Sequence, residues 1–426
     1  MQVALMAFSI LIILMILNIP ISYAMGFAAL GAVLAAGGVP LEVLPQRMYY
    51  GLDTFTLISV PLFMLAGRLM ALGGVTRDLL NLSTVFVGYL RGGLAYVNIV
   101  SSMIFAGITG TAAADTSSIG GILIPAMIQR GYEKDFTVAV TATSSTIGIL
   151  IPPSIPLILY GVSSNSSIGK LFLAGAVPGV LVGIGLMLVT AGIAKKRNYP
   201  VEAVMTWKEG MVICVKSIPA MMTVVIIIGG IVSGFFTTTE AACIACIYTM
   251  LLGIFYYKEL KWRDIPGIIK ETAVTTGMVA LMIATASALG WILANQNVPM
   301  KMASVILSMT DNRIVIFILM NILLLFVGTW LDLTPAVIIF TPILLPIATA
   351  FGMDPIHFGV MMVVNLAIGL FTPPVGVCLF LSCGIAKISI QDTIKAFIPF
   401  FAVLFVILLM ITFIPAISMT LPNLLG

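Results

Sequence analysis

The stretch IGILIPPSIPLILYG at 147–161 interrupts an apolar run with two adjacent prolines, and IGLFTPPVGVCLF at 368–380 does the same in the second half of the chain. A proline inside a helix removes an amide donor and breaks the helix. We therefore predict two broken helices, over 136–162 and 357–386. The loosened segment of each leaves carbonyl oxygens free to face an ion.

The two breaks belong to a repeat that covers much of the chain. The repeat appears when the sequence is aligned with itself at an offset of 221 residues, the distance from Pro152 to Pro373. The coincidences at this offset include Phe105 with Phe326, Gly107 with Gly328, Pro125 with Pro346, Gly148 with Gly369 and Pro178 with Pro399. Glycine and proline determine backbone shape, so we interpret these matches as an internal duplication.

The composition places the chain in a membrane. Apolar residues make up 61% and charged residues 8%, with a mean hydropathy of +1.19. A soluble protein needs about a quarter of its residues charged, so the solvent here is lipid. The apolar runs are too long and too continuous for barrel strands, which predicts an all-α polytopic membrane protein. The first residues carry no positive charge, which indicates a retained membrane segment rather than a signal peptide.

The distribution of charge orients the two repeats. If 93–131 and 314–351 are re-entrant hairpins that enter from opposite sides, all but four of the 20 Lys and Arg residues fall on one side. That side is cytoplasmic by the positive-inside rule. The repeats are therefore predicted to be inverted, with both chain ends outside. The four exceptions are Arg47, Lys170, Lys301 and Arg313.

The repeat also predicts how the chain is divided. Each half begins with helices and an arm and continues with a hairpin, a broken helix and a final helix, which gives 1–92, 93–198, 199–313 and 314–426 as the four units. The amphipathic pieces 75–93 and 300–310 are predicted to lie at the membrane surface.

Small and hydroxyl residues mark the two hairpin tips, GITGTAAADTSSIGG at 107–121 and GTWLDLTPAV at 328–337. Asp115 and Asp332 are ionisable groups at membrane depth, which are costly there unless they are functional or paired. Asp115 has the alternative role of capping the second hairpin helix. The hydroxyls and carbonyls of the tips suit a hard cation such as Na+.

Inverted repeats with broken helices are the architecture of secondary transporters. The broken segments and tips contain no Arg or Lys. An anion would therefore be held by helix N-termini and by hydroxyls such as those of Thr143, Ser144, Ser145 and Ser154. No Walker motif, nucleophile elbow, HExxH or dinucleotide fingerprint is present, and no basic cluster suggests nucleic acid. We predict a transporter and no enzyme.

The chain resembles the large membrane (M) subunit of a tripartite ATP-independent periplasmic (TRAP) transporter, in the DctM-like family of the ion transporter superfamily. The resemblance covers nearly the whole chain. It is carried in order by FAGITGTAAADTSSIG, IGILIPPSIPLILYG, FFTTTEAA, FVGTWLDLTPAVIIFTPILLP and IGLFTPPVGVCLF. Thr238 stands where the family usually has proline, so a milder helix break is expected there.

The resemblance implies an elevator mechanism, in which both hairpins and both broken helices carry solute and Na+ across a static scaffold. One implied sodium site uses Thr109, Thr111, Gly148, Ile151 and Pro153, and the other uses Gly328, Asp332, Gly369, Thr372 and Val375. The solute is expected between them, near Thr111, Asp115, Ser144, Ser145 and Ser154. Na+ is the expected coupling ion, and no other cofactor is expected.

The resemblance also implies two partners, a small four-helix membrane subunit and a soluble periplasmic protein that delivers the solute. We expect Na+-coupled uptake of a small organic acid, a four-carbon dicarboxylate, sialic acid or another sugar acid, across the bacterial inner membrane. No small-subunit helices precede Met1, so a separate small subunit is expected. The alternatives are a stand-alone ion-coupled carboxylate carrier of the same superfamily and a passive channel.

Overall fold

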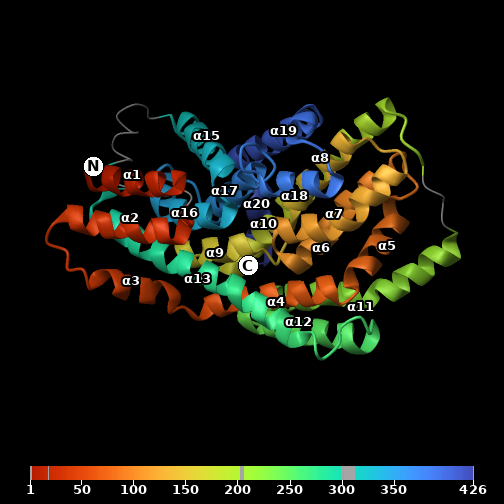
Figure 1. Cartoon of the computed structure of the whole chain (residues 1–426), viewed down its shortest axis with the longest axis horizontal. Helices are drawn as coiled ribbons and strands as arrows, with labels where there is room; N and C mark the ends of the chain where they lie inside the picture. The colour runs from red at the N-terminus through yellow and green to blue at the C-terminus, as the bar shows by residue number, and fades with distance from the viewer. Residues whose placement is uncertain (1, 18, 202–205, 299–300, 302–311, 426) are drawn as a thin grey trace.

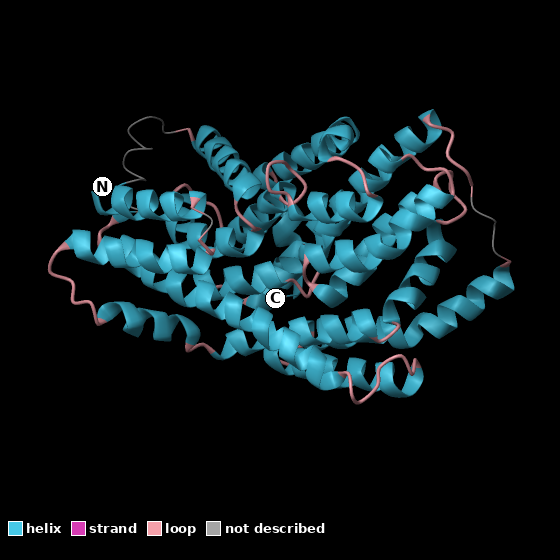
Figure 2. Ribbon diagram, viewed as in Figure 1, coloured by secondary structure: helices cyan, strands magenta, loops and turns pink. Residues whose placement is uncertain are grey.

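The computed structural model describes the chain except residues 1, 18, 202–205, 299–300, 302–311 and 426. Helices and connecting loops make up the described part, and no strand occurs in it (Figure 2). Eight of the described helical segments are long and apolar enough to span a membrane. The predicted all-α polytopic fold is confirmed. The predicted surface piece 300–310 lies almost entirely outside the described residues.

The first half of the chain contains twelve helical segments (Figure 1). The first six, which the sequence predicts to be the scaffold, are α1 (Gln2–Ile16), α2 (Ile21–Ala36), α3 (Val43–Leu52), the 3-10 turn η1 (Phe55–Ile58), α4 (Ser59–Leu72) and α5 (Val75–Val87). The other six, predicted to be transport elements, are α6 (Gly93–Thr109), α7 (Ala112–Gln129), α8 (Lys134–Ser144), the 3-10 turn η2 (Ser145–Ile149), α9 (Ile155–Ser164) and α10 (Ile168–Lys196).

The second half repeats this order in its described residues. The segments of its predicted scaffold are α11 (Trp207–Val232), α12 (Thr238–Leu251), the π-helical turn η3 (Leu252–Tyr256) and α13 (Ile265–Asn295). They are followed by α15 (Arg313–Trp330), α16 (Leu333–Ala350), α17 (Pro355–Gly369), α18 (Val377–Ala386), α19 (Ile390–Phe413) and α20 (Ala416–Leu425). α12 begins at the unusual Thr238, where Thr237 and Glu240 form a capping box.

Each half of the chain contains one hairpin and one broken helix. The hairpins are α6–α7 and α15–α16, whose helices turn at 110–111 and 331–332. The broken helices are α8–η2–α9 and α17–α18, and each loses its helical path at the paired prolines. The sequence placed both breaks correctly, because proline excludes a helical hydrogen bond wherever it occurs inside a helix.

Contacts between the two broken helices show that the repeats are inverted. The Tyr160 hydroxyl, near the end of α9, donates a hydrogen bond of 2.5 Å to the Pro355 carbonyl at the start of α17. At the other end, α18 packs against α8, and a Cβ on Gly120 would contact both Thr141 of α8 and Ile385 of α18. The end of one broken helix therefore lies beside the start of the other. The predicted inversion is confirmed.

The repeats also pack by exchanging equivalent elements. α9 packs on α16 and α18 packs on α7, so each broken helix ends against the hairpin of the other repeat. In the scaffold, α2 packs on α13 and α12 packs on α4. This exchange brings both hairpin tips to one cavity, beside α4 and α13.

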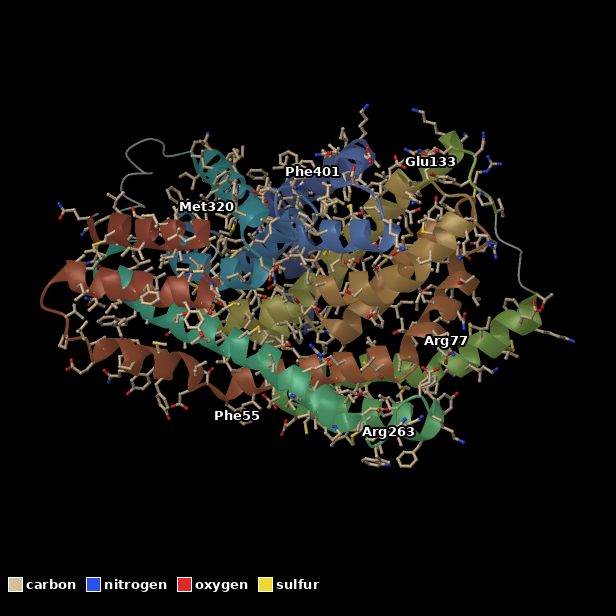
Figure 3. The ribbon with its side chains drawn as sticks, in the orientation of Figure 1. Phe55, Arg77, Glu133, Arg263, Met320 and Phe401 are labelled. Carbon is tan, nitrogen blue, oxygen red and sulfur yellow. The ribbon has the colours of Figure 1, made fainter. Side chains whose placement is uncertain are left out.

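Ionic contacts gather at the end predicted to be cytoplasmic. Arg77, Glu133 and Arg263 lie toward this end in Figure 3. Arg197, at the end of α10, pairs with Glu133 and makes two hydrogen bonds to Asp135, of 2.9 and 3.1 Å. Burial raises the pKa of Asp135, but the bonds from Arg197 outweigh burial and hold that pKa below its ordinary value. These bonds join the start of the first broken helix to the end of α10.

Candidate ion and solute site

The first hairpin tip lies directly against the first break. The Gly110 carbonyl accepts a hydrogen bond of 3.3 Å from the Ile155 amide. Gly110 has φ +61°, and a Cβ at this position would lie 2.8 Å from the Pro153 carbonyl oxygen. Glycine is required here because it tolerates the left-handed backbone and leaves room for the break.

Carbonyl oxygens at the first break are available for a cation. The described residues donate no hydrogen bond to the carbonyls of Ile151 and Pro153, whereas the Ile149 carbonyl accepts one of 2.5 Å from the Ser154 hydroxyl. A Cβ on Gly148 would lie 3.8 Å from the Thr111 carbonyl oxygen. The structure therefore brings Thr111, Gly148, Ile151 and Pro153 together. The Thr109 side chain lies outside the described residues.

The second tip and second break are joined in the same way. The Val375 amide donates a hydrogen bond of 3.1 Å to the Thr329 carbonyl. α15 and α17 make their closest approach at two glycines, where a Cβ on Gly369 would lie 2.3 Å from the Gly328 carbonyl oxygen. No described residue donates a hydrogen bond to the carbonyls of Thr372 and Val375. The side chain of Asp332 is exposed beside this group.

One cavity of about 390 Å³ connects the tips, the breaks and the scaffold. The hairpin tips contribute Thr111–Ala114 and Asp332–Thr334, and the breaks contribute Ile149, Ile155, Pro156, Leu370, Val377 and Cys378. The scaffold wall consists of Met64, Gly67, Arg68 and Ala71 from α4 and Thr275, Met278, Val279 and Met282 from α13. Apolar side chains predominate and a few polar groups converge, as is typical of small-molecule sites.

Of the five residues predicted to bind solute, only Thr111 lines this cavity. Ser154 is the N-cap of α9 and accepts a hydrogen bond from the Leu157 amide. Ser144 and Ser145 are fully buried, and Ser144 donates to the Asn98 side chain at 3.0 Å. The structure thus places these three hydroxyls behind the cavity wall.

Asp115 also lies behind the first tip. It is fully buried, with Ser102 and Ser145 beside it. Neither carboxylate oxygen accepts a hydrogen bond from a described residue. The alternative capping role is not observed, because the N-cap of α7 is Thr111 and Asp115 lies within the first turn. A buried carboxylate without partners requires neutralisation by a proton or a cation.

The sequence did not identify Arg68 as a positively charged side chain of the cavity. Arg68 lines it from α4, although the broken segments and tips themselves lack Arg and Lys, as expected. The charge count had used Arg68 only as an indicator of the cytoplasmic side. One available signal was its position inside the apolar helix SVPLFMLAGRLMAL, because a charge within a membrane helix is a functional candidate.

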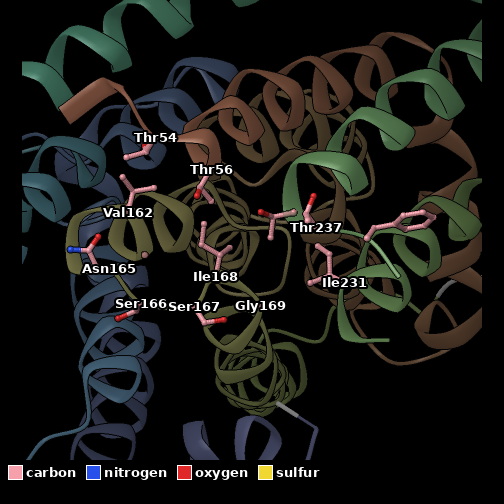
Figure 4. Close-up of a pocket in the computed structure, with 13 residues that line it drawn as sticks. Thr54, Thr56, Val162, Asn165, Ser166, Ser167, Ile168, Gly169, Ile231 and Thr237 are labelled. Carbon is pink, nitrogen blue, oxygen red and sulfur yellow. The ribbon is translucent and has the colours of Figure 1, made fainter. Parts of the chain in front are cut away.

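A second cavity, of about 440 Å³, lies elsewhere between the first broken helix and the scaffold (Figure 4). Its hydroxyl groups come from η1, the α9–α10 turn and the start of α12, and include Thr56, Ser166 and Thr237. None of the predicted ion or solute residues lines it.

Comparison with known proteins identifies the family. The family model described as "Tripartite ATP-independent periplasmic transporter, DctM component" matches residues 8–417. The chain therefore belongs to this family. It is the large membrane component of a TRAP transporter, a multi-pass protein of the inner membrane, as the resemblance predicted.

Members of the DctM family that are named for different solutes are similar to this chain over most of its length. The isethionate TRAP permease protein DctMQ of Oleidesulfovibrio alaskensis is 41% identical over 95% of this chain and 64% of its own. The sialic acid large permease protein SiaM of Vibrio cholerae is 39% identical over 96% of both chains. The C4-dicarboxylate large permease protein DctM of Rhodobacter capsulatus is 34% identical over 99% of both.

A solved structure supports the fold of this DctM-family chain. The YdaH transporter of Alcanivorax borkumensis, described as having an unusual topology, superposes with a TM-score of 0.67 over 90% of both chains. The two sequences are 14% identical, so the likeness concerns the fold alone.

Proposed function

We propose that this TRAP large subunit performs Na+-coupled uptake of a small organic acid. The observation that carries the proposal is the pair of proline breaks, each held against a hairpin tip and each with carbonyls that accept no hydrogen bond from the described residues. Unwound backbone near the midplane of an inverted repeat is the usual site for coupling ions in secondary transporters. Na+ prefers oxygen ligands of this kind.

We assign one Na+ to each break. The first site uses Thr109, Thr111 and the carbonyls of Gly148, Ile151 and Pro153. The second uses Gly328, Asp332, Gly369, Thr372 and Val375. Two Na+ that enter with a monoanion move a net charge of +1, to which the membrane potential contributes about 2.3 kcal/mol per 100 mV. Two Na+ that enter with a dianion move no net charge, so the Na+ concentration gradient alone would drive that uptake.

The solute is proposed to occupy the cavity between the tips and the scaffold. Its volume of about 390 Å³ suits a small organic acid. The relatives named for isethionate, sialic acid and C4-dicarboxylates favour this class, since all three are organic anions. Thr111 is the proposed direct contact. Asp115, Ser144, Ser145 and Ser154 are proposed to support the solute site from behind the tip.

An elevator motion would move this site across the membrane. The cavity lies along the second half of α4, whose end is predicted to be cytoplasmic, and beside the middle of α13. We infer that this arrangement corresponds to a cytoplasm-facing state. In the opposite state, the hairpins and broken helices would meet the other ends of the same scaffold helices. A small four-helix membrane subunit and a periplasmic solute-binding protein are the proposed partners.

Uptake into proteoliposomes tests the proposal. Sialic acid, succinate and isethionate would be supplied with and without a Na+ gradient, and with and without the binding protein. Accumulation that requires both the gradient and the binding protein supports the proposed function. Accumulation without the binding protein supports a stand-alone carrier. Flux that is independent of Na+ and does not saturate identifies a passive channel.

A further inference from the structure

Arg68 is the only arginine or lysine among the described residues that line the solute cavity. Its guanidinium pairs with the Glu271 carboxylate and donates a 3.2 Å hydrogen bond to the Thr275 hydroxyl, both on α13. A guanidinium has five N–H donors, so these two bonds leave donors available to the cavity. The Arg68 side chain is 36% exposed, which gives a solute access to them.

Glu271 is a weakly held partner. Its side chain is 70% exposed, and among the described residues its carboxylate bonds only to Arg68. A carboxylate or sulfonate in the cavity offers Arg68 the same chemistry as Glu271 does. Bidentate geometry on an arginine favours such planar anions. An anionic solute can therefore replace the Glu271 carboxylate on the Arg68 guanidinium.

The position of Arg68 makes this exchange depend on conformation. The other polar groups of the cavity, on Thr111, Asp332 and Thr334, belong to the hairpin tips, whereas Arg68 and Thr275 belong to the scaffold. A solute carried by the tips meets the guanidinium only when the tips lie against this part of α4 and α13. Arg68 therefore attracts the solute in one conformational state and not in the other.

We propose that Arg68 binds the anionic group of the solute in the cytoplasm-facing state, and that Glu271 competes for the same guanidinium and promotes release. The proposal rests on the uptake function proposed above. Arg68 therefore contributes to specificity for anions. Glu271 acts through Arg68 and limits how long the solute stays.

A purely structural brace between α4 and α13 is the alternative explanation, and a nearby ion pair provides the comparison. Arg77 and Glu259 also join the two halves of the scaffold near the same end, at 3.2 Å, but neither residue lines the cavity. Arg77→Gln and Glu259→Gln are therefore matched controls for removing an Arg–Glu pair without changing the cavity.

The test measures solute dissociation constants and uptake rates for the full chain with its small subunit in lipid nanodiscs and proteoliposomes. The probe is whichever of sialic acid, succinate and isethionate the wild type accumulates under a Na+ gradient. We expect Arg68→Gln to weaken binding by about tenfold, as loss of a charge-assisted contact does. Glu271→Gln is expected to tighten binding by about threefold and to slow turnover, because removing a competitor leaves the solute on Arg68 longer. Both control variants should behave as wild type.

Two double variants separate binding from bracing. Arg68→Gln with Glu271→Gln should bind as Arg68→Gln alone, because Glu271 has no effect without the guanidinium. The exchange Arg68→Glu with Glu271→Arg restores an ion pair, so recovery of wild-type binding in it would show a brace and overturn the proposal. If Arg68→Gln does not fold, Glu271→Gln decides, because it leaves Arg68 in place and keeps the shape of the Glu271 side chain.

The result for the wild type separates this inference from the function on which it rests. A wild type that accumulates none of the three probes under a Na+ gradient contradicts the proposed uptake, and the role of Arg68 falls with it. Normal Na+-driven uptake together with unchanged binding in Arg68→Gln and Glu271→Gln overturns the role of Arg68 alone.

Discussion

The two repeats share a backbone and differ in the polar groups that they place on it. Gly148 and Gly369 occupy equivalent positions at the breaks, and so do Ile151 and Thr372, whose carbonyls accept no hydrogen bond from any residue that the structure describes. At the hairpin tips, however, the equivalent residues are Thr111 and Asp332. Both line the cavity, one with a neutral hydroxyl and the other with a carboxylate.

The buried carboxylate of the first repeat has no counterpart in the second. Asp115 lies behind the first tip, fully buried, whereas the equivalent residue of the second repeat is Ala336. The two repeats therefore share the backbone that provides carbonyl ligands for an ion. They differ in where the carboxylate lies, which is buried in the first repeat and exposed in the second. We infer that the carboxylate of the second repeat, on Asp332, faces the cavity directly, while that of the first, on Asp115, is shielded from it.

The largest expected effect comes from the exposed tip. Asp332→Ala should reduce Na+-dependent uptake about 100-fold, because it removes a charged ligand, whereas Thr111→Ala removes a neutral one and should cost about tenfold. Proteoliposome uptake at several Na+ concentrations measures both. Membrane abundance and elution profile should match wild type. Normal uptake by Asp332→Ala would remove this residue from the ion site.

The equivalent glycines should differ in their tolerance of a methyl group. In Gly369→Ala the new Cβ would lie 2.3 Å from the Gly328 carbonyl oxygen, so the backbones of α15 and α17 must separate. In Gly148→Ala the nearest atom is 3.6 Å away, an ordinary contact. Overpacking costs about 1–3 kcal/mol, so we expect a lower melting temperature and impaired uptake for Gly369→Ala only. Equal melting temperatures would contradict the close approach.

The buried carboxylate should affect stability rather than access. Replacing Asp115 with the isosteric Asn removes the negative charge of the buried carboxylate, a change of about 1–3 kcal/mol. We expect Asp115→Asn to melt above wild type in choline chloride. The difference should shrink in sodium chloride if Na+ neutralises the native carboxylate. Asp332→Asn, at an exposed position, should melt close to wild type in both salts.

A melting temperature of Asp115→Asn below that of wild type in both salts would contradict this expectation. It would show that the native carboxylate is stabilised by its surroundings without Na+, and the proposed contrast between a shielded and an open acidic group would be wrong.

The smallest expected difference concerns the restart of each broken helix. Ser154 caps α9 with its side chain, whereas α18 starts at a Gly376 N-cap that has no side-chain hydrogen bond. Ser154→Ala should destabilise the protein by about 1 kcal/mol, the usual effect of losing an N-cap. Val375→Ala, the equivalent position and 39% exposed, is the matched variant and should cost less. Thermal unfolding compares them.

Much of the backbone was predictable because proline and glycine act locally. Pro152 and Pro373 break a helix whatever surrounds them, so the two breaks, the offset between repeats and the positions of Ile151 and Thr372 followed from the sequence. The inversion was predictable from the charges, since a membrane sorts Lys and Arg between its two sides.

The composition of the site was less predictable. Arg68 and Glu271 are distant in the sequence, on helices that only the packed scaffold brings together. Ser144 and Ser145 carry hydroxyls in the expected segment, but the rotation of α8 and η2 buries them. Their depth depends on which neighbours cover them, and a repeat pattern contains no information about that.

The sequence alone determined that this chain is a helical membrane protein of two inverted, proline-broken repeats, and its motifs identified the DctM family. Those properties depend on solvent, local backbone chemistry and residue order. Only the tertiary structure decided that Asp332 is exposed to a cavity, that Asp115 is buried, and that a scaffold arginine faces the hairpin tips. The physical reason is that burial and charge pairing are set by contacts between segments far apart in the chain.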